Sequence, residues 1–396
     1  MNLKNAIRKR ADQCVKCNAC APACPTYAKT LHEGESARGR IALMEGLACE
    51  KLPLTEALLA HLDSCLYCRA CEAVCPSEVK YAETLNLTRQ LIHTKKPFSK
   101  IFSLIFSSKQ ALNIFVFFLI FYQITGLQWF FRKIKIFNLA NKLKRWDRYL
   151  PHLTIRHWKT FYPAQNSQKG TVALFTGCIQ TFVEPSTITS AIRLLNAWGF
   201  DIEIPRSQAC CGAFHLHGGS PDFTKLAEKN KRAFKNKDTV FFTSGCGMIL
   251  KDYPSEKNFN IKDISSFLYT REKPKKLIFK TLKLTAVLHT PCSLKNILQT
   301  ADPTWHLLKL IPGLQIIPLS SSTACCGAAG LNMLTQPEMA DSLAHDLSNK
   351  IKEIKPDILL TSNIGCKIHL ETQLQTYQKI KILHPIELLA MQLESF

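Results

Sequence analysis

The sequence is short of negative charge: its 396 residues include 30 Asp and Glu against 51 Lys and Arg, for a formal net charge of +21. The shortage is sharpest from residue 91 to 170, where Asp147 is the only acidic residue beside fourteen basic ones. A basic surplus of this size favours anionic partners, either nucleic acid or a membrane surface. Because 46% of the residues are hydrophobic, a wholly disordered chain is excluded.

Nucleotide-binding and export signals are also missing. The chain has no Gly-x-Gly-x-x-Gly fingerprint and no P-loop, so it is not expected to bind a dinucleotide, a flavin or ATP through those motifs. Residues 1–16 are mixed and charged, without the apolar stretch of a signal peptide. We therefore expect a cytoplasmic protein, in which 17 cysteines indicate metal or redox chemistry rather than a disulfide scaffold.

Cysteine is absent from residue 76 to residue 177, with nine cysteines before this gap and eight after it. The gap coincides with the basic segment, which is also rich in phenylalanine and tryptophan. The pattern predicts an insert that separates two metal-binding regions.

The first cysteine block repeats one motif, C-x2-C-x2-C-x3-C-P, at residues 14–25 and 65–76. Runs of this spacing bind cubane iron–sulfur clusters, and in two-cluster proteins the fourth cysteine of each run ligates the other cluster. A zinc ribbon would use pairs of cysteines instead. We therefore predict two [4Fe-4S] clusters, one held by Cys14, Cys17, Cys20 and Cys75 and the other by Cys65, Cys68, Cys71 and Cys24.

The residues between the two runs have helical periodicity over 36–47 and 54–62. This predicts an α-helical ferredoxin domain, since a small β-rich ferredoxin would have a shorter, strand-forming connection. Arg38 and Arg40 either offset thiolate charge beside the clusters or lie on a solvated helix face. Cys49, outside both runs, is expected to be a buried small hydrophobic residue.

The second cysteine block is an internal repeat, with intervals of 114, 115 and 120 residues between its matching cysteines. Its two halves contain Cys178, Cys210, Cys211 and Cys246, and then Cys292, Cys325, Cys326 and Cys366. Short apolar runs precede four of these cysteines, and helical stretches such as 186–198 and 222–234 follow. The pattern predicts two similar α/β lobes with mostly parallel sheets, and metal at the carboxyl ends of their strands near the junction.

Metal binding or redox activity is the favoured use of these eight cysteines. Vicinal cysteines rarely bridge each other without strain, and the cytoplasm disfavours stable disulfides. His369 follows Cys366 by three residues and is a candidate ligand, although a packed histidine is the alternative. A further iron–sulfur cluster, zinc and redox-active thiols all remain open for this third site.

Taken together, the two cluster-binding runs and the two Cys-Cys-Gly repeats resemble the iron–sulfur subunit of bacterial glycolate oxidase. Further matches are residues 37–41 (Ala-Arg-Gly-Arg-Ile), 61–66, 326–330 (Cys-Gly-Ala-Ala-Gly) and 363–366. Related families include the third subunit of anaerobic glycerol-3-phosphate dehydrogenase, the lactate-utilisation iron–sulfur proteins and heterodisulfide reductase. The chain departs from the last of these, because Ile249 and His369 stand where its repeats carry a fifth cysteine.

The resemblance implies an electron-transfer subunit of an oxidoreductase that acts on CH–OH donors. A partner subunit would hold FAD and the 2-hydroxy-acid site, and electrons would pass through this chain towards a membrane quinone or similar acceptor. No catalytic residue, no flavin and no nucleic acid partner is expected on this chain. The expected architecture is α + α/β: a ferredoxin domain over 1–95, the insert over 96–165, and Cys-Cys-Gly repeats over 166–275 and 276–396.

The insert contains 22 consecutive uncharged residues, 110–131, which is long enough to span a membrane. A single span would place the ferredoxin domain and the Cys-Cys-Gly lobes on opposite sides, so we expect an interfacial or re-entrant helix instead. Basic residues would then contact anionic headgroups at the cytoplasmic face of the inner membrane: Lys133, Lys135, Lys142, Lys144 and Arg145. A helix docked between domains or onto the flavin subunit is the alternative.

Overall fold

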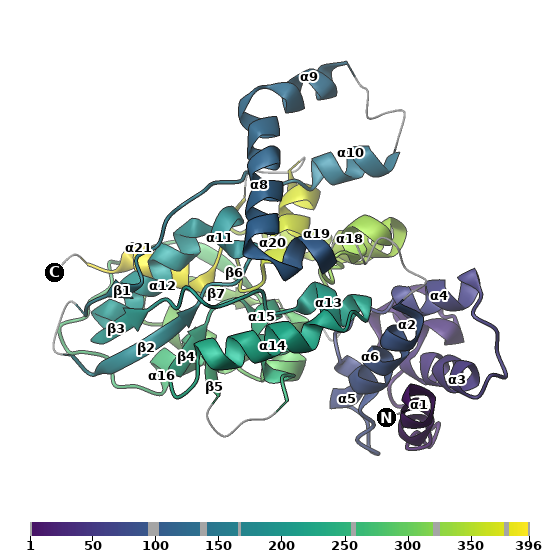
Figure 1. Ribbon diagram of the computed structural model, residues 1–396. Helices are drawn as coiled ribbons and strands as arrows, with labels where there is room; N and C mark the ends of the chain where they lie inside the picture. Colours follow the sequence, from purple (N-terminus) through teal and green to yellow (C-terminus); the bar gives the residue numbers. More distant parts are fainter. Residues whose placement is uncertain are drawn as a thin grey trace.

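The computed structural model describes residues 2–93, 103–134, 141–164, 168–254, 259–319, 325–375 and 380–394. In its N-terminal domain, residues 2–93 form helices joined by turns, on the right in Figure 1. The elements are α1 (Leu3–Ala11), α2 (Pro25–Thr30), the 3-10 turn η1 (Glu33–Glu35), α3 (Ala37–Ala48), α4 (Glu56–Asp63), α5 (Ala70–Ala73) and α6 (Tyr81–Ile92).

The helices predicted over 36–47 and 54–62 are confirmed as α3 and α4. Each begins at a hydroxyl cap: Ser36 Oγ accepts from the amide of Gly39 at 2.9 Å, and Thr55 Oγ1 from that of Leu58 at 3.2 Å. Side chains of α1, α3, α4 and α6 make the domain core, in which Ile7, Met44, Leu62 and Leu85 are fully buried. The core holds the two cysteine runs against each other.

The C-terminal half contains two sheets of the same design. The first lobe comprises β1 (Phe161–Tyr162), β2 (Gly170–Phe175), α11 (Gln180–Val183), α12 (Pro185–Ala197), β3 (Phe200–Glu203), α13 (Ala213–Gly218), α14 (Asp222–Ala233), β4 (Asp238–Phe241), α15 (Ser244–Lys251), β5 (Asn260–Asp263) and α16 (Ile264–Tyr269). The second comprises β6 (Thr285–His289), the π-helical turn η4 (Ser293–Leu298), α17 (Ala301–Leu308), β7 (Gln315–Pro318), α18 (Asn332–Thr335), α19 (Pro337–Ile354), β8 (Ile358–Thr361), α20 (Ile364–Leu374), β9 (Lys381–Leu383) and α21 (Pro385–Gln392).

The strand order reveals the duplication. The first sheet runs β1-β3-β2-β4-β5 and the second β7-β6-β8-β9, so β2 to β5 correspond to β6 to β9. All the pairings are parallel except that of β1 with β3, as the sequence predicts. The lobes share one core, in which Leu174 and Ile188 of the first are buried with Leu360 and Ile386 of the second. In each lobe the two central strands end at neighbouring points, where the cysteines follow.

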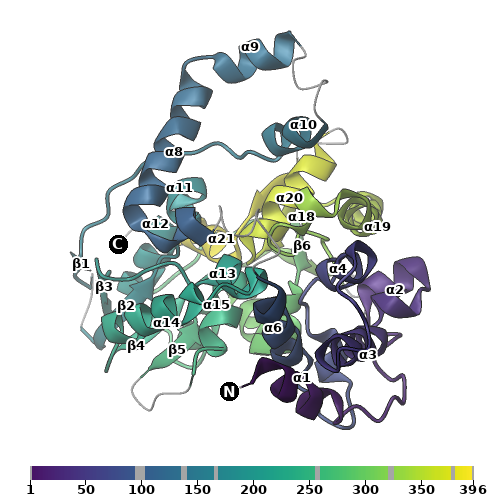
Figure 2. The same ribbon diagram turned by 45° about the vertical axis from the view of Figure 1, so that its right-hand side comes forward.

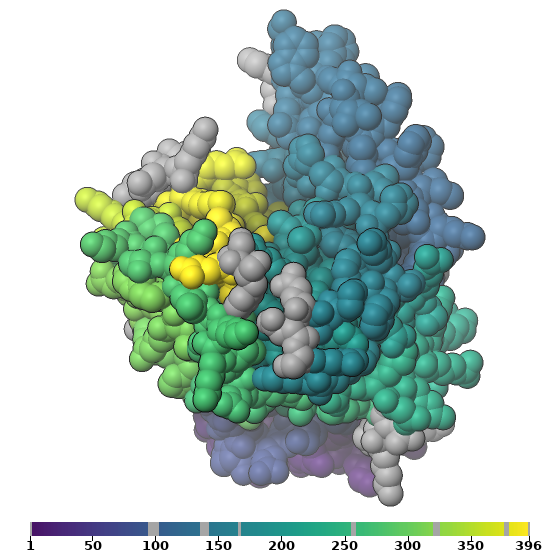
Figure 3. All heavy atoms as spheres, turned by 90° about the vertical axis from the view of Figure 1, so that its left-hand side faces the viewer, coloured from purple at the N-terminus to yellow at the C-terminus, as the bar shows by residue number. Residues whose placement is uncertain are grey.

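The insert stands apart from both regions. It contains α8 (Lys109–Ile124), α9 (Leu127–Lys133) and α10 (Asn141–Arg148), and Figures 1 and 2 show α8 rising from the first lobe with α9 at its far end. In the space-filling view of Figure 3 the same residues form a prominence above the lobes. Within the described residues no single helix is long and apolar enough to cross a membrane; α8 and α9 together pass that test but are bent by 61°.

Candidate metal centres

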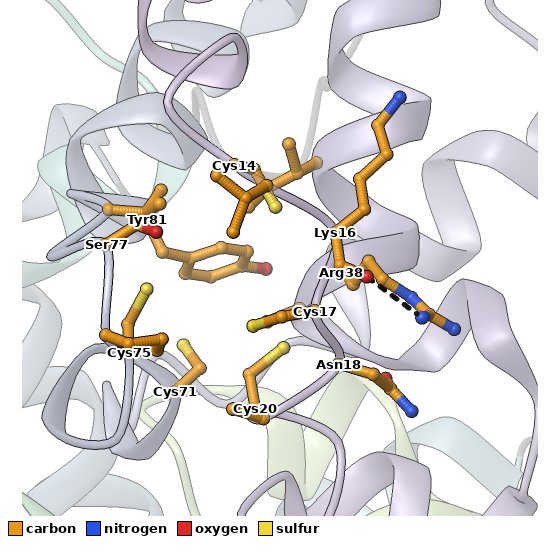
Figure 4. Close-up of a pocket in the computed structure, with 16 residues that line it drawn as sticks. Cys14, Lys16, Cys17, Asn18, Cys20, Arg38, Cys71, Cys75, Ser77 and Tyr81 are labelled. Atoms are coloured by element: carbon orange, nitrogen blue, oxygen red, sulfur yellow. Dashed lines mark hydrogen bonds between the residues drawn. The ribbon is translucent and has the colours of Figure 1, made fainter.

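Five cysteines of the N-terminal domain surround one hollow, here called the first hollow, of about 430 Å³. Cys14, Cys17 and Cys20 come from the first run, and Cys71 and Cys75 from the second. Figure 4 shows their sulfurs around a common space that the ring of Tyr81 also borders. The four cysteines predicted to hold the first cluster therefore lie together, although they are up to 61 residues apart in the sequence.

A second hollow of about 320 Å³ is lined by Cys24, Cys65, Cys68 and Cys71. These are the four cysteines predicted for the other cluster, and Cys24 reaches them from the opposite run. Cys71 lines both hollows, so the two sites are direct neighbours. The structure thus brings each predicted ligand set together in the crossed arrangement, while the ligand assignment itself stays a prediction.

The loops that carry the thiols share an unusual backbone. Lys16 and Asn18, on either side of Cys17, have φ of 58° and 69°, and the matching residues Tyr67 and Arg69 have φ of 53° and 55°. Residues other than glycine rarely adopt this left-handed conformation, and they do so where the surroundings require it. The two runs therefore fold into the same loop, which motif spacing alone did not reveal.

Arg40 lies beside the second hollow and is the residue whose role the sequence left undecided. It is 1% exposed, which excludes the solvated helix face. Its guanidinium donates to the carbonyls of His61 and Glu35, both at 2.6 Å, to the Ser64 hydroxyl at 2.8 Å and to the Glu35 carboxylate, and it lies 4.0 Å from Cys24 Sγ. Burial alone would lower the pKa of Arg40, but the charges of Cys65 and Glu35 outweigh it and raise the pKa. Arg40 is therefore a fixed buried cation at the thiols.

The chemistry of the thiols fits an iron–sulfur cluster. Burial raises the pKa of Cys20, Cys68 and Cys71, so ionising them without a nearby positive charge is unfavourable. Thiolates are the ligands of such clusters, and the iron ions would supply the missing positive charge. Cys14, Cys17, Cys20 and Cys75 would hold one cluster, and Cys65, Cys68, Cys71 and Cys24 the other.

The four cysteines of the first Cys-Cys-Gly repeat also converge, beyond the carboxyl ends of β2 and β4. Cys178 Sγ lies 3.3 Å from Cys210 Sγ, and the thiols of Cys211 and Cys246 interact. The amide of Gly212 donates to Cys210 Sγ at 3.4 Å. Gly212 has φ of 86°, and a Cβ there would lie 2.8 Å from the Phe223 ring. Glycine is required at this position by both conformation and space.

In the second repeat, the amide of Gly327 donates to Cys325 Sγ at 3.4 Å, as Gly212 does to Cys210. Cys326 and Cys366, with Cα atoms 5.5 Å apart, form a disulfide. The expectation of no disulfide is wrong for this pair, because it concerned bridging between vicinal cysteines, whereas the end of β8 brings Cys366 to Cys326. Cys292 and Cys325 are free thiols, so a metal held by all four cysteines would require reduction of this disulfide.

His369, the predicted additional ligand, is fully buried and both of its ring nitrogens are occupied. Nδ1 lies 2.7 Å from the carbonyl oxygen of Cys326, and Nε2 lies 3.3 Å from Oδ1 of Asp341. In this structure the ring therefore positions the Cys326 backbone and offers no nitrogen to a metal. Among the described residues, no three His, Cys, Asp or Glu side chains are arranged to hold a single metal ion.

The candidate centres adjoin one another. Cys68 of the second hollow interacts electrostatically with Cys292 and Cys325 of the second repeat, and Asn296 donates to the Cys68 carbonyl at 3.0 Å. The two repeats meet where Ser293 Oγ lies 2.9 Å from Ser244 Oγ, each beside a cysteine-bearing segment. A continuous series of thiol groups therefore runs from the N-terminal domain into the lobes.

Comparison with known proteins agrees with this division. A family model described as a 4Fe-4S dicluster domain matches residues 10–79, and one described as a cysteine-rich domain matches 172–251 and 286–371. The fold and site thus define an iron–sulfur protein that joins a dicluster domain to two cysteine-rich domains.

Several relatives match along their whole length. The chain is 30% identical to the "Probable glycolate oxidase iron-sulfur subunit" of Bacillus subtilis, covering 98% of this chain and 96% of that protein. It is 28% identical to the "Glycolate oxidase iron-sulfur subunit" of Escherichia coli K12 (99% and 97%), and 28% to a subunit of the anaerobic glycerol-3-phosphate dehydrogenase of the same organism (96% and 98%). The chain belongs to the family of glycolate oxidase iron–sulfur subunits, and its role is electron transfer within an oxidoreductase complex.

Proposed function

We propose that this chain carries electrons in a glycolate dehydrogenase, from an FAD-containing partner subunit towards a membrane quinone or similar acceptor. The partner would oxidise the 2-hydroxy acid to the 2-oxo acid, and the two electrons removed would enter this chain. The observation that supports it best is the pair of adjoining hollows, each lined by four thiols from both cysteine runs. Two [4Fe-4S] clusters are proposed there, and a bound cluster of this kind takes up and releases one electron at a time.

The residues of this chain would position and tune those groups. Arg40 offsets thiolate charge at the second hollow, and a buried counter-charge shifts the balance between the oxidised and reduced forms of a redox centre. Tyr81 donates from its hydroxyl to Cys65 Sγ at 3.4 Å, which also withdraws charge from that sulfur. The first Cys-Cys-Gly repeat, with four free thiols, is the proposed position of any further cluster or zinc.

The test measures metal and electron flow separately. Purified chain should contain about eight irons if the two hollows are filled and about twelve if a third cluster is bound. Cys68→Ser should remove one cluster's electron paramagnetic resonance signal and stop electron flow, while glycolate still reduces the flavin of the partner. Cys49→Ser is the matched control, since Cys49 lies outside both hollows. Full turnover with Cys68→Ser, or iron-free chain in an active complex, would contradict the proposal.

We also propose that the chain is peripheral on the cytoplasmic face of the inner membrane, with α8 and α9 in contact with lipid. The support is a stripe of apolar residues on one face of α8, spaced three or four apart and 48–74% exposed: Ile114, Phe117, Phe118, Phe121 and Ile124. Trp129 and Phe130 of α9 continue it. Exposed apolar stripes of this size are typical of interaction surfaces, and aromatic residues are favoured at the lipid interface.

Some of the basic residues predicted at the headgroups have other partners. Arg145 binds Asp341 through two contacts of 2.8 Å, so it fastens α10 to the second lobe. Lys133 lies over the Trp129 ring at 4.8 Å, and Lys142 and Lys144 are exposed. Lys135 lies outside the described residues. Lys133, Lys142 and Lys144 therefore stay as the proposed contacts to anionic lipid.

A further inference from the structure

A cavity of about 1000 Å³ lies at the foot of α8, between the insert and the first lobe. Its floor includes Cys178 and Cys210, the closest pair of free thiols in the first Cys-Cys-Gly repeat, together with the buried side chains of Thr176 and Gln208. The cavity therefore reaches the sulfurs of a candidate redox centre directly. The role of an electron carrier does not by itself account for such a space.

The walls of the cavity are apolar and partly aromatic. Phe106 and Leu112 come from the insert, Trp158 from the segment that follows it, and Phe182 and Ile204 from the first lobe. These side chains belong to three separate segments, so the space forms only when the insert is folded against the lobe. Apolar walls with a few polar groups are typical of sites for organic ligands that have a flat or hydrophobic body.

The mouth of the cavity is basic. Lys109, Arg156, Arg206 and Lys229 line it and are exposed, and among its described lining residues there is no carboxylate. Lys109 donates to the carbonyl of Arg206 at 2.6 Å, which fixes its ammonium group at the rim. Cations at this position would stabilise negative charge that develops on a ligand in the cavity.

The cavity is continuous with the apolar stripe of α8. Leu112 and Asn113 line the cavity, and Ile114, the next residue, begins the exposed stripe that ends at Ile124. A ligand with a hydrophobic tail could therefore occupy the cavity with its ring and lay its tail along α8. Small hydroxy acids would use the basic mouth but neither the apolar walls nor the stripe.

We propose that this cavity binds the headgroup of a quinone, next to Cys178 and Cys210. This rests on the proposed function, which supplies the electrons: the quinone gains two electrons and two protons to become the quinol, and the substrate oxidised by the partner loses two of each. The apolar walls hold the ring, the cations of the mouth stabilise the reduced oxygens, and solvent at the open mouth supplies the protons. The cavity is thus the exit of electrons from this chain.

Binding is measured without turnover, by equilibrium dialysis of the purified chain with ubiquinone-1, a soluble short-tailed quinone. Asn113→Trp fills the cavity from an exposed position and should weaken quinone binding by about tenfold or more, equivalent to about 1.4 kcal/mol. Gln110→Trp is the matched control, because Gln110 is an exposed residue of the same helix that does not line the cavity, and it should bind as the wild type does. A photoactivatable azidoquinone should label peptides that contain Trp158 or Phe182.

Three outcomes would overturn the proposal: no quinone binding by the wild-type chain, equal binding by Asn113→Trp and Gln110→Trp, or labelling elsewhere. Tight binding of glycolate or glyoxylate that excludes the quinone would assign the cavity to a carboxylate instead. These failures are distinguishable from failure of the proposed function. If glycolate still reduces the chain in the complex and an artificial dye still accepts the electrons, the carrier role stands and only the quinone site is lost.

Discussion

Arg69 of the second cysteine run and Asp252 of the first lobe form an ion pair of 2.7 Å between residues 183 positions apart. Arg69 adopts the left-handed conformation described above, and the same guanidinium also binds Glu72 at 2.7 Å. Both partners are largely buried, so the pair is shielded from solvent. It fixes the loop that carries Cys68 onto the lobe that carries Cys246.

Asp252→Ala should therefore loosen the contact between the N-terminal domain and the first lobe. A buried hydrogen bond to a charged group contributes about 2 kcal/mol, and the free energy of unfolding should fall by that order. Urea unfolding followed by circular dichroism measures it. Asp222→Ala is the control, because its partner Lys225 is a surface lysine three residues away, and it should leave the midpoint unchanged. Equal midpoints for the two variants would contradict the role given to Arg69.

Arg40→Met should destabilise the N-terminal domain severely. The Glu35 carboxylate would lose its buried partner, and removing one member of a buried ion pair costs about 3–5 kcal/mol. Iron content should fall with stability. Arg38→Met, on the same helix, removes only a surface contact with Glu33 and should behave as the wild type. In the double variant Arg40→Met with Glu35→Gln, part of the stability should return, because no buried charge is left unpaired.

Acid should destabilise the second lobe through His289. This ring is 2% exposed at the end of β6, and burial lowers its pKa to about 4. Since the pKa in the unfolded chain is about 6.5, the neutral ring stabilises the fold above that pH, and this contribution is lost as the pH falls towards 4, by about 3 kcal/mol. His289→Gln should flatten the dependence of urea stability on pH between 7 and 4. The exposed His345→Gln should not, and an unchanged slope in His289→Gln would exclude His289 as the cause.

Serine at Phe117, Phe118 and Phe121 should release the chain from lipid. All three rings are exposed on the stripe of α8, so the fold should be preserved, and the partition coefficient into vesicles with anionic phospholipid should drop by about tenfold or more. Flotation with the vesicles measures it. A control with serine at the exposed residues Leu31, Ile278 and Met391 removes comparable apolar surface away from the insert. If both triple variants float equally well, lipid contact through α8 is excluded.

The sequence was most informative where spacing carries chemistry. The two cysteine runs and the Cys-Cys-Gly intervals located the residues that converge in space, and helical or strand periodicity located α3, α4, β2 and β6. Each of these signals is local: a thiol motif fits within a loop, and a period fits within one helix or strand. The parallel order of the strands followed from the alternation of strands and helices.

Long-range contacts could not be predicted in the same way. The burial of Arg40 depends on Glu35, Ser64 and His61, which come from separate segments. His369 was a reasonable ligand by spacing, but Asp341 lies 28 residues away and occupies it. The cavity at the foot of α8 likewise needs Phe106, Trp158 and Ile204, whose meeting no local pattern encodes.

The crossing of the two cysteine runs has a consequence for how the protein matures. Cys24 lines the second hollow and Cys75 the first, so neither set of four thiols is complete until both runs have been synthesised and folded together. On a ribosome, a nascent chain that ends before the second run would expose three thiols with no fourth. We therefore expect iron and sulfide to be inserted after the N-terminal domain has folded, and the loading of one site to depend on the other.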